Sequence, residues 1–171
     1  EILTNQDYEI NKNSSVIEIK KNTFYNDLLL NISYKEDTLD LGEDKDPFRN
    51  SMIIKLPQLI SDTLELRQSF IGKIKDKKIT YLNSKKDDSY IYANTSSLGK
   101  YTISRDTIKP EIKPINFKQN SNISNRSTIR LRLKDEISGI KSYNAYLNGK
   151  WALFEYEPKS NLIFHKISDN I

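Results

Sequence analysis

Residues 135–158 read DEISGIKSYNAYLNGKWALFEYEP, and this stretch indicates the fold most directly. Two short segments in which apolar and polar side chains alternate flank Asn148-Gly149, the residue pair most typical of a two-residue type I′ hairpin turn. Alternation places successive side chains on opposite faces of a strand. The stretch therefore predicts a β-hairpin.

The same period of two recurs along the chain, whereas helical periodicity is weak. It is clearest at Ile129, Leu131 and Leu133, which alternate with basic residues, and it returns in residues 28–34. The other candidate strands are residues 16–20, 52–56, 63–67, 78–82, 89–93, 101–105 and 162–167. The polar turn clusters between them are residues 11–15, 40–46, 84–88 and 120–125. Residues 58–67 could also contain a helical turn. The pattern predicts an all-β protein built from β-sandwiches.

Composition narrows the class of protein. A chain of 171 residues with 36% hydrophobic residues is long for one sandwich and sufficient for two small domains. There is no cysteine, which excludes disulfides, thiolate nucleophiles and zinc–thiolate sites. No apolar stretch approaches the ~20 residues of a membrane-spanning helix, and no signal-peptide pattern is present. Because the chain opens with Glu1, we expect it to be a piece or mature form of a longer protein.

The net charge of +4 is compatible with an anionic partner. Lysine outnumbers arginine, however, and acidic residues are interleaved with basic ones, whereas nucleic-acid-binding proteins cluster basic side chains on one face. The one short basic cluster on a strand face is Arg130, Arg132 and Lys134. We therefore expect no nucleic-acid partner.

The domain boundary is predicted at residues 106–110, DTIKP, which are followed by Pro114. Proline fixes its own φ angle and pushes the preceding residue toward extended geometry, so this segment is expected to form a stiff connector. The predicted domains are residues 1–107, a β-sandwich, and residues 108–171, an Ig-like β-sandwich. The second segment is short for a closed Ig-like sandwich. We expect it to be incomplete at its C-terminal end, or shielded by a neighbour, because missing strands leave an exposed edge.

Several short motifs carry a resemblance to a known family. They are Leu98–Thr102, Asp106-Thr107 with Pro110, Asp135–Ile140, Asn148–Trp151 and Glu155–Lys159. Together they resemble the Ig-like modules that follow the catalytic domain in some Bacteroidetes lysostaphin-type zinc peptidases. Those envelope enzymes cut peptide cross-links in peptidoglycan. The resemblance covers mainly the last seventy-odd residues, and Ig-like modules accompany many unrelated catalytic domains.

The resemblance does not extend to a catalytic centre. Lysostaphin-type peptidases hold zinc through a His-x-x-x-Asp and a His-x-His element, and His165 is the single histidine of this sequence. The kinship therefore implies that the catalytic domain lies outside this chain or has been lost. We expect this chain not to be an enzyme and to have no catalytic residue, metal ligand or cofactor.

Other side chains could in principle take part in chemistry, and each of them also has a structural role to fill. His165 could be a pH switch or a lone metal ligand, but a half-buried strand position is the more common use. Calcium could bind the acidic run Asp37, Asp40, Glu43, Asp44 and Asp46, or Asp106 with Asp135 or Glu136. The spacing of the acidic run does not match an EF-hand and favours a solvated turn.

Glu155 and Glu157 share one strand face and are expected to be solvated, opposite Phe154 and Tyr156, rather than to form a glycosidase pair.

Aromatic residues offer the remaining candidate site. Trp151 with Tyr81, Tyr90, Tyr92, Tyr143 and Tyr146 could form a sugar-stacking platform, although aromatic rings also dominate the cores of small domains. Trp151 follows a tight turn and alternates with Leu153, which favours packing.

The sequence thus predicts two tandem β-sandwich domains that form a non-catalytic accessory region of an exported bacterial envelope peptidoglycan peptidase. The expected location is the periplasm or cell envelope. The expected partners are the protein's own catalytic domain, outside this chain, or the cell-wall glycan. The alternative is a carbohydrate-binding or adhesion module of a bacterial surface protein.

Overall fold

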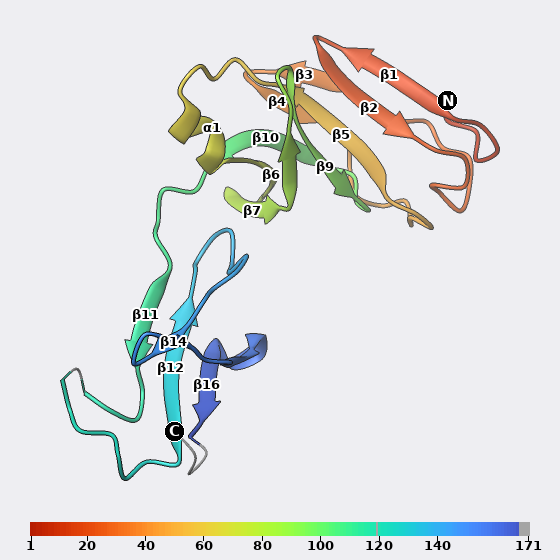
Figure 1. Ribbon diagram of the computed structural model, residues 1–171. Coiled ribbons are helices and arrows are strands. Elements are labelled where there is room, and N and C mark those ends of the chain that lie inside the picture. The colour runs from red at the N-terminus through yellow and green to blue at the C-terminus, as the bar shows by residue number, and fades with distance from the viewer. Residues whose placement is uncertain (119, 168–171) are drawn as a thin grey trace. The chain divides into compact units, whose positions relative to one another are not determined.

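Strands connected by tight turns dominate the structure, a computed structural model that describes residues 1–118 and 120–167 (Figure 1). Contacts between Cα atoms divide the chain into two units, Glu1–Thr107 and Ile108–Ile171, which we call the first and the second domain. The predicted all-β class and the β-sandwich architecture are confirmed.

The first domain consists of two five-stranded antiparallel sheets. One sheet has the order β1-β2-β5-β9-β8, with β1 Tyr8–Lys12, β2 Ser15–Ile19, β5 Met52–Pro57, β9 Tyr90–Thr95 and β8 Ser84–Lys86. The other has the order β3-β4-β10-β6-β7, with β3 Ser33–Lys35, β4 Thr38–Asp40, β10 Lys100–Arg105, β6 Ser69–Lys75 and β7 Lys78–Leu82.

Alternation explains how these sheets enclose a core. On β5, Met52, Ile54 and Leu56 are buried while the residues between them are half-buried. Ile71 on β6 and Tyr101 on β10 enter the same core from the opposite sheet. The first domain is therefore a sandwich whose layers meet through one continuous apolar cluster.

The second domain has a smaller framework. Its four-stranded antiparallel sheet has the order β11-β12-β16-β15, with β11 Glu111–Pro114, β12 Thr128–Lys134, β16 Leu162–Lys166 and β15 Glu155–Glu157. A two-stranded ribbon, β13 Tyr146–Leu147 and β14 Lys150–Trp151, supplies residues that pack against one face of this sheet. A 3-10 turn, η1 Pro158–Ser160, connects β15 to β16. Ile112 on the edge strand β11 is 58% exposed, although it pairs with buried Leu133, so part of the inner face is uncovered.

Residues 63–67 were predicted as a strand, with a helical turn within residues 58–67 as the alternative. They form most of helix α1, Thr63–Gln68, so the alternative is correct. The Asp62 carboxylate caps this helix by accepting a hydrogen bond from the Glu65 backbone N–H at 2.8 Å. The residue pattern Asp-x-x-Glu is a capping signal, and the cap outweighs the strand tendency of this short segment.

Several other segments differ from the predicted strands and turns. Strand β1 extends into the predicted turn at residues 11–15, and β4 and β11 were not predicted. Residues 28–34 alternate in burial as predicted, but the only backbone pairing in residues 28–32 is a bridge between Leu28 and Ile2. Residues 84–86, predicted as a turn, form β8. Strand β6 was not predicted because residues 69–72 are buried on both faces, which removes the period of two.

Candidate functional site

The hairpin predicted at Asn148-Gly149 forms as expected. Both residues have positive φ, +50° and +77°, which is the backbone conformation of a type I′ turn. Tyr146 pairs with Trp151, and the backbone N–H of Ala152 donates to the carbonyl oxygen of Ala145 at 3.0 Å. The pairing therefore continues beyond the named strands, and it fixes which side chains share a face.

The outer face of this ribbon carries three exposed apolar side chains. Tyr146 is 63% exposed, Trp151 is 62% exposed and Leu153 is 61% exposed. Tyr146 and Trp151 are direct cross-strand neighbours, and Leu153 follows two residues later, so alternation places it on the same side. The packing role predicted for Trp151 is wrong, because its side chain is exposed. We call these three residues the aromatic surface.

The opposite face of the ribbon belongs to the core. Ala145, Leu147 and Ala152 pack against the second-domain cluster, and Phe154 is a buried member of it. The sequence predicts the alternation of residues 151–154, but the side that packs on the core carries half-buried Ala152 and buried Phe154 rather than Trp151 and Leu153. The reason is that the sheet of the second domain lies on that side.

Two side chains hold the segment that follows the hairpin. The Tyr143 hydroxyl donates to the carbonyl oxygen of Phe154 at 2.6 Å. Nδ1 of His165 lies 2.7 Å from the carbonyl oxygen of Leu153, so Nδ1 carries the proton and donates. The imidazole also stacks on the Phe154 ring, with 5.2 Å between ring centroids. These contacts hold the backbone that presents the aromatic surface.

His165 on β16 therefore supports the fold of the second domain through these contacts. Its Nε2 atom is buried and has no hydrogen-bond partner among the described residues. Among residues 1–118 and 120–167, no group of three or more histidine, aspartate or glutamate side chains is placed to hold a metal ion.

The other tyrosines considered for a sugar platform have different surroundings. Tyr81 packs on Phe70 in the first domain, with ring centroids 5.0 Å apart, and Tyr90 and Tyr92 are half-buried on β9. Tyr143 packs edge-on against Tyr156 beside the second core. Of the predicted set, the register brings together Tyr146 and Trp151. The signal for this pair was present in the sequence, because a two-residue turn at Asn148-Gly149 fixes the cross-strand partners.

The acidic run forms local contacts within the first domain. Asp40 accepts a hydrogen bond from the Gly42 backbone N–H at 2.9 Å and lies 3.6 Å from the Lys100 ammonium. Asp44 pairs with Lys73 at 2.8 Å, and its other oxygen accepts from the Leu98 N–H at 2.9 Å. Glu43 accepts from Lys45, and this hydrogen bond raises the pKa of Lys45. The contacts match the solvated turn that the sequence favoured.

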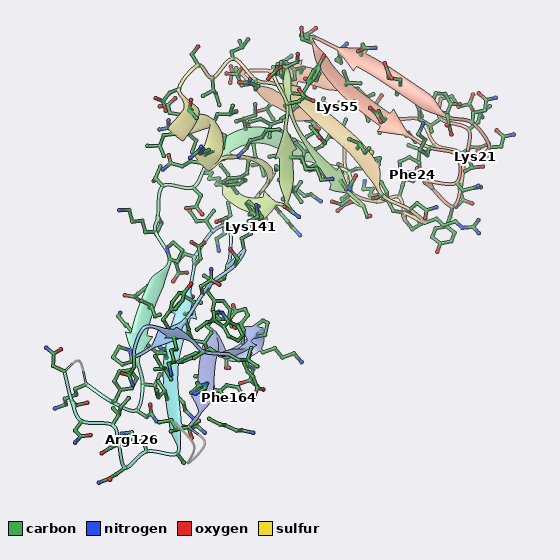
Figure 2. The ribbon with its side chains drawn as sticks, viewed as in Figure 1. Lys21, Phe24, Lys55, Arg126, Lys141 and Phe164 are labelled. Atoms are coloured by element: carbon green, nitrogen blue, oxygen red, sulfur yellow. The ribbon has the colours of Figure 1, made fainter. Side chains whose placement is uncertain are left out.

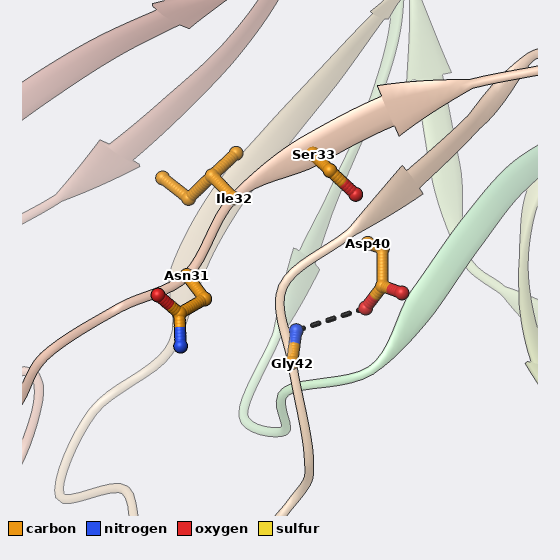
Figure 3. Close-up of a pocket in the computed structure, with 5 residues that line it drawn as sticks. All are labelled: Asn31, Ile32, Ser33, Asp40 and Gly42. Carbon is orange, nitrogen blue, oxygen red and sulfur yellow. Dashed lines mark hydrogen bonds between the residues drawn. The ribbon is translucent and has the colours of Figure 1, made fainter.

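An open depression of about 230 Å³ lies beside this run (Figure 3). It is lined by the residues Asn31, Ile32, Ser33, Asp40 and Gly42. Asp40 is the one charged group in the lining, and its two oxygens are already engaged by Gly42 and Lys100. The depression is therefore a weaker candidate for a binding site than the aromatic surface.

The Asp135 carboxylate organises the loop of the motif Asp135–Ile140, whose first five residues read Asp-x-x-Ser-Gly. Its Oδ1 atom accepts hydrogen bonds from the backbone N–H groups of Ile137, Ser138 and Gly139, at 3.0, 2.8 and 3.0 Å. Gly139 has a φ of +74°, which a glycine adopts without strain. The carboxylate thus stabilises a tight loop, and one of its two oxygens is engaged by the backbone.

We expect Asp135→Ala to lower the free energy of unfolding of the second domain by about 1–2 kcal/mol, because three backbone donors lose their acceptor. Asp135→Asn keeps one acceptor oxygen and should retain more than half of this stability. Urea denaturation of both variants provides the measurement. Equal losses for both variants would show that the charge, and not the acceptor geometry, stabilises the loop.

Glu155 and Glu157 lie on β15 with exposed side chains, while Tyr156 between them packs against the core. The solvated face predicted for these two carboxylates is confirmed.

Comparison with known proteins gives one family. A family model described as a Zu5-like domain matches residues 2–106. Neither a curated protein nor a solved structure matches the chain. Among the described residues, no helix has the length and apolar character needed to cross a membrane.

Proposed function

The chain belongs to the Zu5-like domain family through residues 2–106, and we propose that it is a non-catalytic accessory region of an exported bacterial peptidoglycan peptidase that binds the cell-wall glycan. The catalytic domain would lie outside this chain. The resemblance of the second domain to the Ig-like modules of lysostaphin-type peptidases supports the type of parent enzyme. The aromatic surface supports the glycan.

The exposed pairing of Tyr146 with Trp151 is the observation that carries the proposal. Folded domains usually place large aromatic rings in the core, and here two rings stand side by side in solvent with Leu153 next to them. Aromatic faces suit the C–H surfaces of sugar rings, and both Tyr and Trp add a polar group that can bond a sugar hydroxyl.

The support beneath the aromatic surface makes it suited to binding. Tyr143 and His165 hold the backbone of Phe154 and Leu153 through hydrogen bonds of 2.6 and 2.7 Å. A surface that is already ordered loses little conformational entropy when a ligand binds. The net charge of +4 also favours association with anionic wall polymers.

The test is retention of the chain on purified, insoluble peptidoglycan. We expect the unchanged chain to be retained and Trp151→Ala to weaken binding by at least about tenfold, because buried tryptophans contribute most to binding at interfaces. Tyr25→Ala is the matched control, since Tyr25 is 61% exposed in the first domain and is not part of the aromatic surface. The control variant should bind like the unchanged chain.

A second measurement uses fluorescence. Trp151 is the single tryptophan of the sequence, so its emission should change when soluble glycan fragments of peptidoglycan are added. No retention of the unchanged chain, or equal retention of Trp151→Ala, would refute glycan binding at this surface.

The alternative function is a carbohydrate-binding or adhesion module of a bacterial surface protein, and the same aromatic surface favours it. Binding to other polysaccharides with no retention on peptidoglycan would support this alternative. A parent gene that encodes His-x-x-x-Asp and His-x-His before Glu1 would support the accessory region of a peptidase.

A further inference from the structure

The outer face of the four-stranded sheet in the second domain has an ordered distribution of charge. Strand β12 contributes Arg130 and Arg132, and β15 contributes glutamates. The strand between them, β16, contributes Leu162, Phe164 and, at its end, exposed Lys166. Cross-strand partners of an antiparallel sheet point to the same side. Because Leu131 and Ile163 face the core, these residues face away from it.

The register aligns these residues in two rows. One row is Arg130, Phe164 and Glu155, and the second is Arg132, Leu162 and Glu157. Each row therefore runs from a positive to an apolar to a negative side chain across neighbouring strands. Figure 2 labels Phe164, the apolar member of the first row.

Within the described residues, no ion pair engages the charges at the two ends of the rows. Ion pairs engage the nearby lysines, Lys113 with Glu111 and Lys134 with Glu136, but none involves Arg130, Arg132, Glu155 or Glu157. Glu157 does accept a hydrogen bond from the neutral Ser160 hydroxyl at 2.7 Å. The four charged side chains are exposed, and Phe164 and Leu162 are half-buried.

We propose that this face associates with the same face of a second copy of the chain, about a two-fold axis parallel to β16. This rotation places β12 of one copy over β15 of the other and keeps each row over its own counterpart. Arg130 then meets Glu155 of the other copy, and Arg132 meets Glu157, so four ion pairs surround two apolar contacts, Phe164 on Phe164 and Leu162 on Leu162. In such an isologous contact both copies use the same face, so association stops at the dimer.

The charge pattern argues for a copy of this chain as the partner. A polyanion would meet the two arginines but would be repelled by the two glutamates of the same rows, about 10 Å away at the ordinary strand spacing. Within the two rows a second copy of the face avoids this conflict, because each charge meets its opposite. Lys166, which follows the rows on β16, meets its own counterpart and weakens the association.

The size of the face sets the expected strength. Four strands of about five residues span roughly 300 Å² of sheet, which is less than the ~800 Å² per partner of a standard interface. The association should therefore be weak, with dissociation in the range from about 10 μM to about 1 mM, and should weaken further with salt.

Sedimentation equilibrium of the chain over this concentration range tests the proposal. We expect reversible dimerisation of the unchanged chain. Arg132→Glu and Glu157→Arg should each weaken it by at least about tenfold, because each places two like-charged contacts in the dimer. Arg126→Glu makes the same charge change in the loop before β12, at a residue labelled in Figure 2, and should leave dimerisation unchanged.

Mixing the two single variants gives the most specific readout. In a mixed dimer, the substituted glutamate of one copy faces the substituted arginine of the other, and the remaining pair is native. We therefore expect an equimolar mixture of Arg132→Glu and Glu157→Arg to associate at least about tenfold more tightly than either variant alone. Equal urea midpoints of all variants at low concentration would exclude misfolding.

A chain that remains monomeric at about 1 mM overturns the proposal, and so does dimerisation that does not respond to these charges or a mixture that associates no better than its components. Glycan is absent from this experiment, so its result is independent of the proposed function.

Discussion

Replacing Tyr101 with alanine is expected to lower the free energy of unfolding of the first domain by about 3–5 kcal/mol. The ring is fully buried, at 0% exposure, between the two sheets. Its hydroxyl lies 2.9 Å from the Thr95 hydroxyl and 2.5 Å from the Ser97 carbonyl oxygen. The substitution leaves a cavity and also removes the hydroxyl that bonds to Thr95 and Ser97, so the two losses add.

Tyr101→Phe separates these contributions. The phenylalanine fills most of the same space and removes only the hydroxyl, so we expect a loss of about 1–3 kcal/mol from the unpaired groups. Urea denaturation followed by circular dichroism provides both values. A loss below about 1 kcal/mol for Tyr101→Ala would contradict the central position of this ring.

Phe154→Ala is expected to lower the stability of the second domain by about 3 kcal/mol or more. The buried apolar cluster of this domain comprises Ile129, Leu133, Phe154 and Ile163 within the described residues, so one phenylalanine is a large share of it. Its ring also supports His165, whose Nδ1 donates to Leu153. The substitution should therefore also weaken the backbone support of the aromatic surface.

Phe164→Ala is the matched control on the neighbouring strand. Its side chain is half-buried on the outer face and lies outside the core cluster, so we expect a loss of about 1 kcal/mol when the chain is monomeric. Amide hydrogen exchange, followed peptide by peptide in rising urea, measures the two domains separately. Phe154→Ala should affect only second-domain peptides, and Tyr101→Ala only those of the first. Equal losses in both domains for either variant would contradict two separate cores.

Several elements were predictable because their signals are local or periodic. Strand β12 is predicted by its alternation of apolar and basic residues, and residues 52–56 of β5 are among the candidate strands; both strands bury one face as expected. The hairpin at Asn148-Gly149 was predicted from two adjacent residues. The domain boundary was predicted from Pro110 and Pro114, and contacts in the structure divide the chain between Thr107 and Ile108.

Other hairpins were not predictable in this way. The turns at Glu36-Asp37 and Asp76-Lys77 have positive φ at both central residues, although neither contains glycine. The turn at Asn13-Ser14 has the same conformation and lies within the predicted turn cluster at residues 11–15. This conformation strains residues such as Glu36 and Lys77. It persists because the paired strands on either side, such as β3 with β4, require a two-residue turn with matching twist.

The two proposed sites were also predictable only in part. The cross-strand pairing of Tyr146 with Trp151 followed from the turn, but their exposure did not. The row that contains Arg130 and Glu155 could not be predicted from the sequence. Strands β12 and β15 are distant in sequence, and each pairs with β16 rather than with the other.

By itself, the sequence determined that this chain forms strands, where one tight turn falls, and which side chains alternate. Those properties depend on neighbouring residues and on the two-residue period of a strand. The tertiary structure alone decided which face of each strand is buried and which strands lie side by side. An alternating segment has two equivalent faces, and the layer that packs against one of them, as the second-domain sheet does against Ala152 and Phe154, makes the choice.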